Sequence, residues 1–166
     1  MNISFERSEN RTDEWYTPKN IIDALGPFDL DPCAPVTGTR PYDFARFHYD
    51  KNIDGLSKEW FGRVWCNPPY SQPSLRLFIE KMAQHANGIA LIFNRMDNSL
   101  WHDVIFPTAD AILIIRGRIK FLKEGVKGNH QAGCGSVLIA WGKVNAECLR
   151  TCNIPGKYFN LKQQES

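Results

Sequence analysis

The stretch Arg63-Val64-Trp65-Cys66-Asn67-Pro68-Pro69-Tyr70 combines a short apolar segment with a rigid turn and an aromatic side chain. Residues 63–66 favour a β-strand, and the two prolines that follow can neither continue a backbone ladder nor start a helix at once. Pro68 also shifts Asn67 toward extended backbone, so the Asn67 amide and the neighbouring carbonyl groups project from the end of the strand. The sequence therefore predicts a polar site where this strand ends.

An exocyclic amine is the chemical group that such a site suits. The amide oxygen of Asn67 and the backbone carbonyl of Pro68 could accept both hydrogens of an amine. The ring of Tyr70 could stack on the ring that carries the amine. A plain Pro-Pro turn without any ligand is the alternative, because a four-residue motif can arise by chance.

The composition indicates one globular domain. The chain has 166 residues, of which 43% are hydrophobic and 23% are charged, which is enough for a single core. We expect one domain over residues 14–160, between a polar leader at 1–13 and a polar tail at 161–166. The sequence has neither an apolar run of about 18 residues nor the apolar stretch of a signal peptide, so we expect a soluble, intracellular protein.

The cysteines and the charged residues indicate which metal and anion sites the chain can form. The five cysteines form no C-x-x-C pair and no zinc-ligand spacing with histidine, so we expect reduced thiols and no metal. A net charge of +2 permits an anionic partner without requiring one. The positive residues between Arg116 and Lys127 fit either a phosphate-binding surface or a solvated strand edge.

Two segments before the Asn67 turn have features of a cofactor site. Thr17 and Pro18 predict the start of a helix, with Thr17 as the cap and Pro18 at the first helical position, which would offer backbone N–H groups to a carboxylate. Residues 28–31 alternate as a short strand, and Asp31 falls at its carboxyl end. Ligands of open parallel sheets bind at that edge, where a carboxylate can hold an ammonium or ribose hydroxyls. We therefore expect a cofactor beside Asp31.

The interval between Asp31 and Asn67 barely accommodates a crossover helix and a second strand, since a βαβ unit takes roughly 30 residues or more. We expect residues 37–52 to be rich in turns and the front of the fold to be abbreviated. Asp54, in Asp54-Gly55-Leu56, could bind an adenine amino group or could simply form a turn.

The second half alternates helical and strand patterns. Residues 71–86 predict a helix that ends near Asn87-Gly88, and residues 100–105 predict a short one. We expect strands at 89–93, at 111–115 continuing through 116–121, and at 136–141 as the last strand of the domain. The polar loop at 94–98, which contains Arg95, follows a strand end of the kind that faces ligands. This alternation indicates an α/β layer fold.

Five motifs in this order resemble those of the small phage-type DNA N6-adenine methyltransferases. They are Trp15-Tyr16-Thr17-Pro18, Phe28-Asp29-Leu30-Asp31-Pro32-Cys33-Ala34, Asp54-Gly55-Leu56, Asn67-Pro68-Pro69-Tyr70 and Gly117-Arg118-Ile119-Lys120-Phe121. The resemblance covers roughly residues 13–141. It implies an abbreviated Rossmann-like fold with a mostly parallel sheet flanked by helices, S-adenosylmethionine as methyl donor, DNA as substrate and adenine N6 as acceptor. The loop after Asp31 departs from the family because it lacks the glycine-rich continuation.

The resemblance and the charge pattern together nominate the site residues. The expected catalytic residues are Asn67, Pro68, Pro69 and Tyr70, and the expected cofactor-binding residues are Tyr16, Thr17, Pro18, Asp31, Pro32, Cys33, Ala34, Asp54 and Leu56. The expected DNA contacts are Arg95, Arg116, Arg118, Lys120, Lys123 and Lys127.

Three other functions fit the same residues. A methyltransferase that acts on the glutamine amide of a protein shares the Asn-Pro-Pro-Tyr motif, although the chain is short and the region from Gly117 to Lys127 is basic. A cytosine N4 methyltransferase more often has Ser or Thr in place of Asn67. A catalytically silent module would bind nucleic acid with the same salt dependence and transfer no methyl group.

Overall fold

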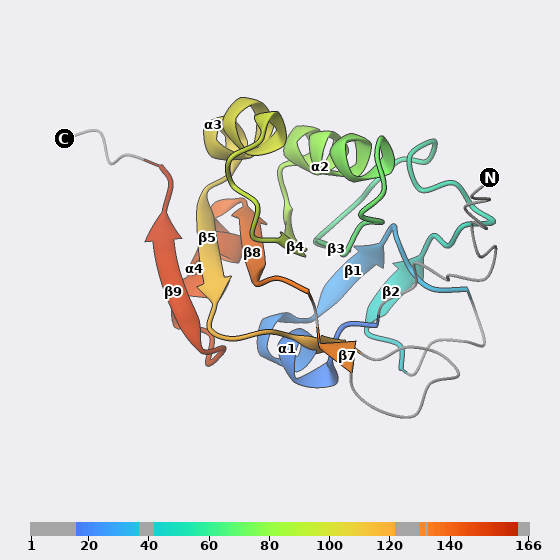
Figure 1. Ribbon diagram of the computed structural model, residues 1–166. Helices are drawn as coiled ribbons and strands as arrows, with labels where there is room; N and C mark the ends of the chain where they lie inside the picture. The colour runs from blue at the N-terminus through green and yellow to red at the C-terminus, as the bar shows by residue number, and fades with distance from the viewer. Residues whose placement is uncertain (1–15, 37–41, 122–129, 132, 163–166) are drawn as a thin grey trace, which may run out of the picture.

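The computed structural model describes residues 16–36, 42–121, 130–131 and 133–162, and it has helices on both faces of a central sheet (Figure 1). In the first half of this part of the chain lie α1 (Lys19–Leu25), β1 (Phe28–Asp31), β2 (Ala45–His48), β3 (Val64–Cys66), α2 (Ser74–His85) and β4 (Gly88–Phe93). The second half contains the π-helix η1 (Leu100–Ile105), α3 (Phe106–Thr108), β5 (Ala111–Ile115), β6 (Lys120–Phe121), β7 (His130–Gln131), β8 (Ser136–Trp141), α4 (Lys143–Thr151) and β9 (Gly156–Asn160).

The central sheet is mixed. Its seven strands among the described residues follow the order β2-β1-β3-β4-β8-β5-β9. The pairs from β2 to β4 are parallel, and the pairs from β4 to β9 are antiparallel. The predicted α/β class and Rossmann-like character are therefore confirmed. The sheet is partly parallel and not mostly parallel as predicted, because parallel pairing is confined to the half that carries Asp31 and Asn67.

Alternating side chains divide the core into two layers. In β4, Ile89 and Leu91 face the layer that contains α1 and α4, whereas Ala90 and Ile92 face the layer that contains α2 and η1. Figure 1 shows α2 and α3 on one side of the sheet and α1 on the other. Burial on both faces explains why β4 is apolar along its whole length.

A buried polar network joins the two helices of the α1 side to β3. The guanidinium of Arg63 donates to Asn145 Oδ1 at 2.6 Å and to the carbonyls of Leu25 and Pro27 at 2.6 and 2.9 Å. Asn145 is fully buried and donates through Nδ2 to Asn87 Oδ1 and to the Trp141 carbonyl. These bonds hold α4, the end of α1 and the start of β3 in one arrangement.

The predicted helix start at Thr17 and Pro18 is wrong in its details. Helix α1 begins at Lys19, Pro18 is its N-cap residue, and no side chain caps it. Thr17 lies outside the helix. Its side chain is buried against the turn after β3, where its hydroxyl oxygen accepts a hydrogen bond from Asn67.

The predicted continuation of the strand at 111–115 through 116–121 is also wrong. Strand β5 ends at Ile115, and Gly117 has a φ of +76°, a backbone conformation that turns the chain and that glycine adopts without strain. Strand β6 then pairs with β7 in a separate two-stranded sheet. Phe121 and Ile119 nevertheless pack into the α1 side of the core.

Two strands of the central sheet lie where the sequence patterns indicated none. Strand β2 occupies part of the interval predicted to be rich in turns, and β9 follows β8, which was expected to be the last strand. Each of them forms an edge of the sheet and is mostly exposed, so neither has the apolar pattern of an internal strand.

Candidate active site at the ends of β1 and β3

The predicted catalytic and cofactor segments follow two neighbouring parallel strands. Strands β1 and β3 pair in parallel through Leu30 and Val64, so their carboxyl ends lie at the same edge of the sheet. Directly beyond these ends, Cys33 Sγ lies 3.7 Å from Cys66 Sγ. The fold therefore brings the loop after Asp31 against the residue that precedes Asn67.

The loop after β1 is held by short-range hydrogen bonds. Asp31 is 4% exposed, and its Oδ1 accepts from the Cys33 backbone N–H at 3.0 Å. The backbone of this loop also pairs with Tyr49, through the Asp31 carbonyl and the Ala34 N–H. Burial, followed by the hydrogen bond with Cys66, raises the pKa of the Cys33 thiol well above its ordinary value, so Cys33 stays protonated at neutral pH. The loop thus presents one carboxylate and a neutral thiol at the strand end.

The segment Asp54-Gly55-Leu56 packs directly on this loop. A Cβ atom at Gly55 would lie 2.3 Å from the carbonyl oxygen of Pro32, so the close approach of the two backbones requires glycine. Asp54 is exposed, and its Oδ1 accepts from the Leu56 N–H at 3.1 Å, which is the turn interaction that the sequence left open as an alternative. Lys81 donates to the Leu56 carbonyl and holds the segment to α2.

Thr17 reaches the catalytic turn from a distant part of the sequence. Its Oγ1 accepts from Asn67 Nδ2 at 3.3 Å, and the side chain of Thr17 is 6% exposed. The carbonyl of Thr17 accepts a short hydrogen bond from the Tyr42 hydroxyl. Thr17 and Asn67 were predicted for different parts of the site, and the structure places them in direct contact.

The turn after Asn67 leads into an aromatic stack. Pro68 is buried, Pro69 is half-buried, and the ring of Tyr70 stacks on Phe93 with ring centroids 3.9 Å apart and planes 15° from parallel. The Tyr70 hydroxyl is buried and has no hydrogen-bond partner among the residues that the structure describes. Burial, together with the nearby Cys134 and Cys66 thiols, raises the pKa of this phenol far above its ordinary value.

Phe93 and Tyr42 are the residues of this region that sequence reasoning missed. Phe93 ends the apolar strand β4 immediately before a polar loop, and this position of an aromatic residue is the signal that could have indicated it. The guanidinium of Arg95 lies 5.8 Å from the centroid of the Phe93 ring and extends the stack toward solvent. Nothing in the residues around Tyr42 indicates its contact with Thr17.

The expected DNA contacts divide between two groups. Arg95, Arg116, Arg118 and Lys120 are exposed, and Lys123 and Lys127 lie outside the described residues. The register of the sheet places the ends of β4 and β5 at the same edge, because the start of β8 pairs with both of them. Arg95 and Arg116 therefore lie at the edge that carries Asn67. Arg118 donates to the Gly133 carbonyl, next to the start of β8.

The sequence of the chain matches a known family of enzymes. Residues 5–158 match the family described as DNA N-6-adenine-methyltransferase (Dam). The chain belongs to this family. The resemblance read from the five motifs is thereby confirmed, and the methyltransferase family implies S-adenosylmethionine and DNA.

A phage protein of similar sequence supports the same assignment. A DNA N-6-adenine-methyltransferase of Escherichia phage T1 is 30% identical over 140 residues, which cover 79% of this chain and 55% of that protein. The chain therefore spans about half the length of this curated relative. No solved structure matches the chain.

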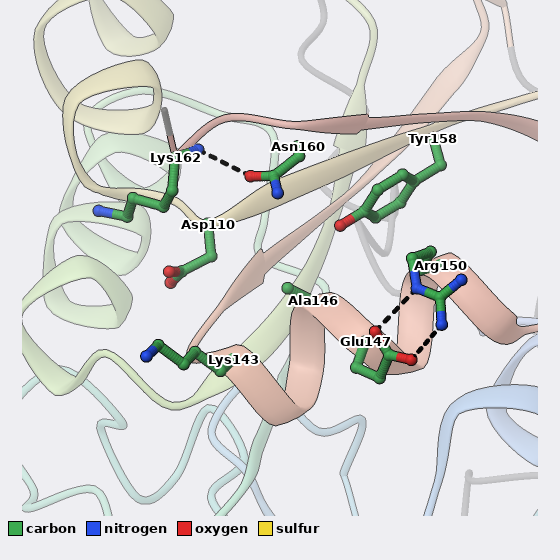
Figure 2. Close-up of a pocket in the computed structure, with 8 residues that line it drawn as sticks. All are labelled: Asp110, Lys143, Ala146, Glu147, Arg150, Tyr158, Asn160 and Lys162. Carbon is green, nitrogen blue, oxygen red and sulfur yellow. Dashed lines mark hydrogen bonds and ion pairs between the residues drawn. The ribbon is translucent and has the colours of Figure 1, made fainter. Parts of the chain in front are cut away.

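A separate polar cavity lies on the other side of the molecule. It has a volume of about 470 Å³ and is lined by residues of α4, β9 and their neighbours, including Lys143, Glu147 and Tyr158 (Figure 2). Figure 2 shows Glu147 paired with Arg150, and this pairing lowers the pKa of the Glu147 carboxyl. Every residue predicted for the methyltransferase site is absent from its lining.

Within the described ranges, no helix combines the length and apolar character that a membrane span requires.

Proposed function

We propose that this Dam-family chain transfers a methyl group from S-adenosylmethionine to N6 of adenine in DNA. The observation that supports this proposal best is the placement of the Asp31 loop beside Asn67 at the ends of adjacent parallel strands. Cofactor and acceptor amine would meet there within a few ångströms. The family of the chain and the name of the similar phage T1 protein, a DNA N-6-adenine-methyltransferase, point to the same reaction.

The side chains at this edge of the sheet have the chemistry that S-adenosylmethionine requires. A carboxylate at the end of β1, supplied by Asp31, suits the hydroxyl or ammonium groups of S-adenosylmethionine. The close packing of Gly55 on Pro32 would form one wall of the binding site, and the neighbouring Leu56 would offer an apolar contact for the adenine ring of the cofactor. Tyr16, Thr17 and Pro18 would also border the site, because Thr17 contacts Asn67, and Asp54, Cys33 and Ala34 would complete it.

The protein's own task in this reaction is positioning. S-adenosylmethionine supplies a methyl group that its sulfonium has already activated. Asn67 Oδ1 and the Pro68 carbonyl would accept the two amine hydrogens of the target base, so that the N6 lone pair points at the methyl carbon. The N6 amine would take the methyl group from the cofactor's sulfur, and its surplus proton would pass to solvent. Pro69 would keep this turn rigid, and a strong base is unnecessary because the methyl group is already activated.

The target adenine must leave the duplex to reach this turn. Flipping costs a few kcal/mol of lost stacking and pairing, and stacking on an aromatic side chain restores part of it. Tyr70 would receive the flipped base on the ring face turned away from Phe93. The contact at 3.9 Å between these two rings keeps Tyr70 from rotating, which lowers the entropy lost when the base binds.

Exposed cations at the same edge would hold the flanking DNA. Arg95 and Arg116 follow the ends of β4 and β5, and Arg118 and Lys120 lie farther along in the segment that leads to β6. Lys123 and Lys127 remain predicted DNA contacts, and both lie outside the described residues. Contacts of this kind fix register on the phosphate backbone and carry little sequence information.

The decisive experiment is methyl transfer to DNA with methyl-labelled S-adenosylmethionine, followed by digestion to nucleosides. We expect label on N6-methyladenine. Asn67→Ala should abolish transfer while cofactor binding stays within twofold, because the amine loses an oriented acceptor and a misplacement of about 1 Å can cost a hundredfold in rate. Asn153→Ala, at an exposed site before β9, is the matched control and should retain transfer.

Other outcomes would identify the alternatives. Label on cytosine would favour N4 methylation, and label on added protein would favour the glutamine amide. DNA binding without any label would indicate a silent binding module. Transfer to adenine at the parent rate by Asn67→Ala would show that the motif has been misread.

A further inference from the structure

We propose that Thr17 is a positioning residue for the catalytic amide: its hydroxyl orients the side chain of Asn67 so that the amide oxygen faces the substrate amine. This inference rests on the proposed function and assigns to Thr17 a role beyond the border of the cofactor site. It starts from the hydrogen bond that Asn67 Nδ2 donates to Thr17 Oγ1 at 3.3 Å.

An asparagine amide has two chemically opposite ends. Oδ1 accepts hydrogen bonds and the Nδ2 group donates them, and the two ends differ little in size, so shape alone cannot select one orientation. A threonine hydroxyl can donate or accept, and in the structure Thr17 Oγ1 accepts from Asn67 Nδ2, so Oδ1 lies on the other side of the amide. In the reverse orientation two N–H groups would oppose the N–H groups of the amine, and the substrate would be repelled.

Thr17 can orient Asn67 only if Thr17 itself is held in place. The residue is 6% exposed, and its carbonyl accepts a hydrogen bond from the Tyr42 hydroxyl. The Tyr42 ring contacts Phe44 at 5.8 Å between centroids, and Phe44 contacts Trp65 of β3 at 6.4 Å. These aromatic side chains therefore connect Thr17 to strand β3, which ends immediately before Asn67.

The side chain of Thr17 takes no part in helix α1, which follows it in the sequence. Helix α1 begins at Lys19, and the side chain of Thr17 caps none of its N–H groups. The hydroxyl of Thr17 therefore serves the Asn67 contact and not the stability of the helix. A change that removes only this hydroxyl should act on Asn67 with little effect on α1.

Two substitutions at one position separate orientation from packing. Thr17→Val keeps the shape of threonine and removes the hydroxyl, whereas Thr17→Ser keeps the hydroxyl and removes the methyl group. We expect kcat for adenine methylation to fall by about tenfold to a hundredfold in Thr17→Val, because the amide is no longer oriented, and the cofactor Kd to change by a smaller factor than kcat. Thr17→Ser should restore most of the lost kcat.

A second readout does not depend on activity. In a spectrum of protein labelled with ¹⁵N, the side-chain amide signals of Asn67, assigned by their loss in Asn67→Ala, should move in Thr17→Val and stay close to the parent positions in Thr17→Ser. Tyr42→Phe, which removes one hydroxyl and keeps the ring packing, should lower kcat less than Thr17→Val does. This variant also keeps the proposal testable if Thr17→Val fails to fold.

Several results would overturn the proposal. Equal kcat in Thr17→Val and the parent would do so, as would a weaker cofactor Kd with unchanged kcat, which would make Thr17 a cofactor ligand only. A larger loss in Thr17→Ser than in Thr17→Val would assign Thr17 to packing. If the parent protein methylates no adenine, the proposed function fails, and unmoved Asn67 signals in Thr17→Val would independently reject the orienting bond.

Discussion

Replacement of Asp31 by asparagine should weaken the binding of S-adenosylmethionine without disturbing the loop that carries it. The side chain is 4% exposed at the end of β1, and Oδ1 accepts from the Cys33 N–H at 3.0 Å. Asparagine keeps an oxygen for that bond and loses the negative charge. If the carboxylate makes one charge-assisted hydrogen bond to the cofactor, its loss removes about 1.5–3 kcal/mol and weakens affinity by about 10- to 100-fold.

Titration calorimetry with S-adenosylmethionine measures this change directly, and two further variants isolate its cause. Asp31→Ala also deletes the acceptor for Cys33 and should cost about 1 kcal/mol of unfolding free energy in addition. Asp29→Asn makes the same change of charge on the same strand, where Asp29 Oδ2 accepts from the Arg63 N–H at 2.7 Å, and should leave affinity unchanged. Parent affinity in a folded Asp31→Asn, or an equal loss in Asp29→Asn, would refute the assignment of Asp31.

Three further changes test other parts of the molecule. Tyr70→Phe removes a buried hydroxyl that has no partner among the described residues. It should raise the free energy of unfolding by about 1 kcal/mol, which corresponds to a rise in Tm of roughly 2–4 °C in a scanning calorimeter. A lower Tm would show that the hydroxyl has a hydrogen-bond partner. Arg118→Ala should reduce the slope of log affinity against log salt on duplex DNA by about 0.9. The control Lys143→Ala, beside the cavity in Figure 2, should leave this slope unchanged. Equal slopes in the two variants would show that Arg118 is solvated and contacts no phosphate. Asn145→Leu leaves the guanidinium of Arg63 without one acceptor and should lower the unfolding free energy by roughly 3 kcal/mol in urea, whereas a loss under 1 kcal/mol would show that the network relaxes.

The internal strands could be predicted because their pattern follows from burial. Strands β1 and β8 begin and end where the sequence predicted, and β4 differs from its predicted range by one residue. Strand β3 lies within the predicted segment and ends immediately before the Pro-Pro turn. Both faces of β4 and β8 are covered, so these strands are apolar apart from Ser136, and their short length with β-branched residues distinguishes them from helices.

The edge strands could not be predicted because their stability comes from their partners. Strand β2 has one buried residue, and β9 has none, so each adopts extended backbone chiefly by pairing with β1 or β5. Neither carries the alternation that marks a half-buried strand. The end of β5 was missed for a related reason, since residues 116–121 remain β-prone while Gly117 changes the direction of the chain.

The sequence by itself determined which chemical groups stand at the strand ends. Asp31, Asn67 and the Pro-Pro turn follow short strands whose apolar character is local, so their positions at an edge of the sheet could be inferred from residue order. The order of the five motifs also identified the family, which the match over residues 5–158 confirms. Both inferences depend on information that lies within a few residues of each motif.

Only the tertiary structure decided which of these groups touch. The contacts of Asn67 with Thr17 and of Tyr70 with Phe93 join segments that are far apart in the sequence, and the approach of Cys33 to Cys66 does the same. Such contacts depend on the register of parallel strands and on the path of the chain between them. Register is settled when the buried faces of distant strands pack together, so the pattern of one segment alone does not specify these contacts.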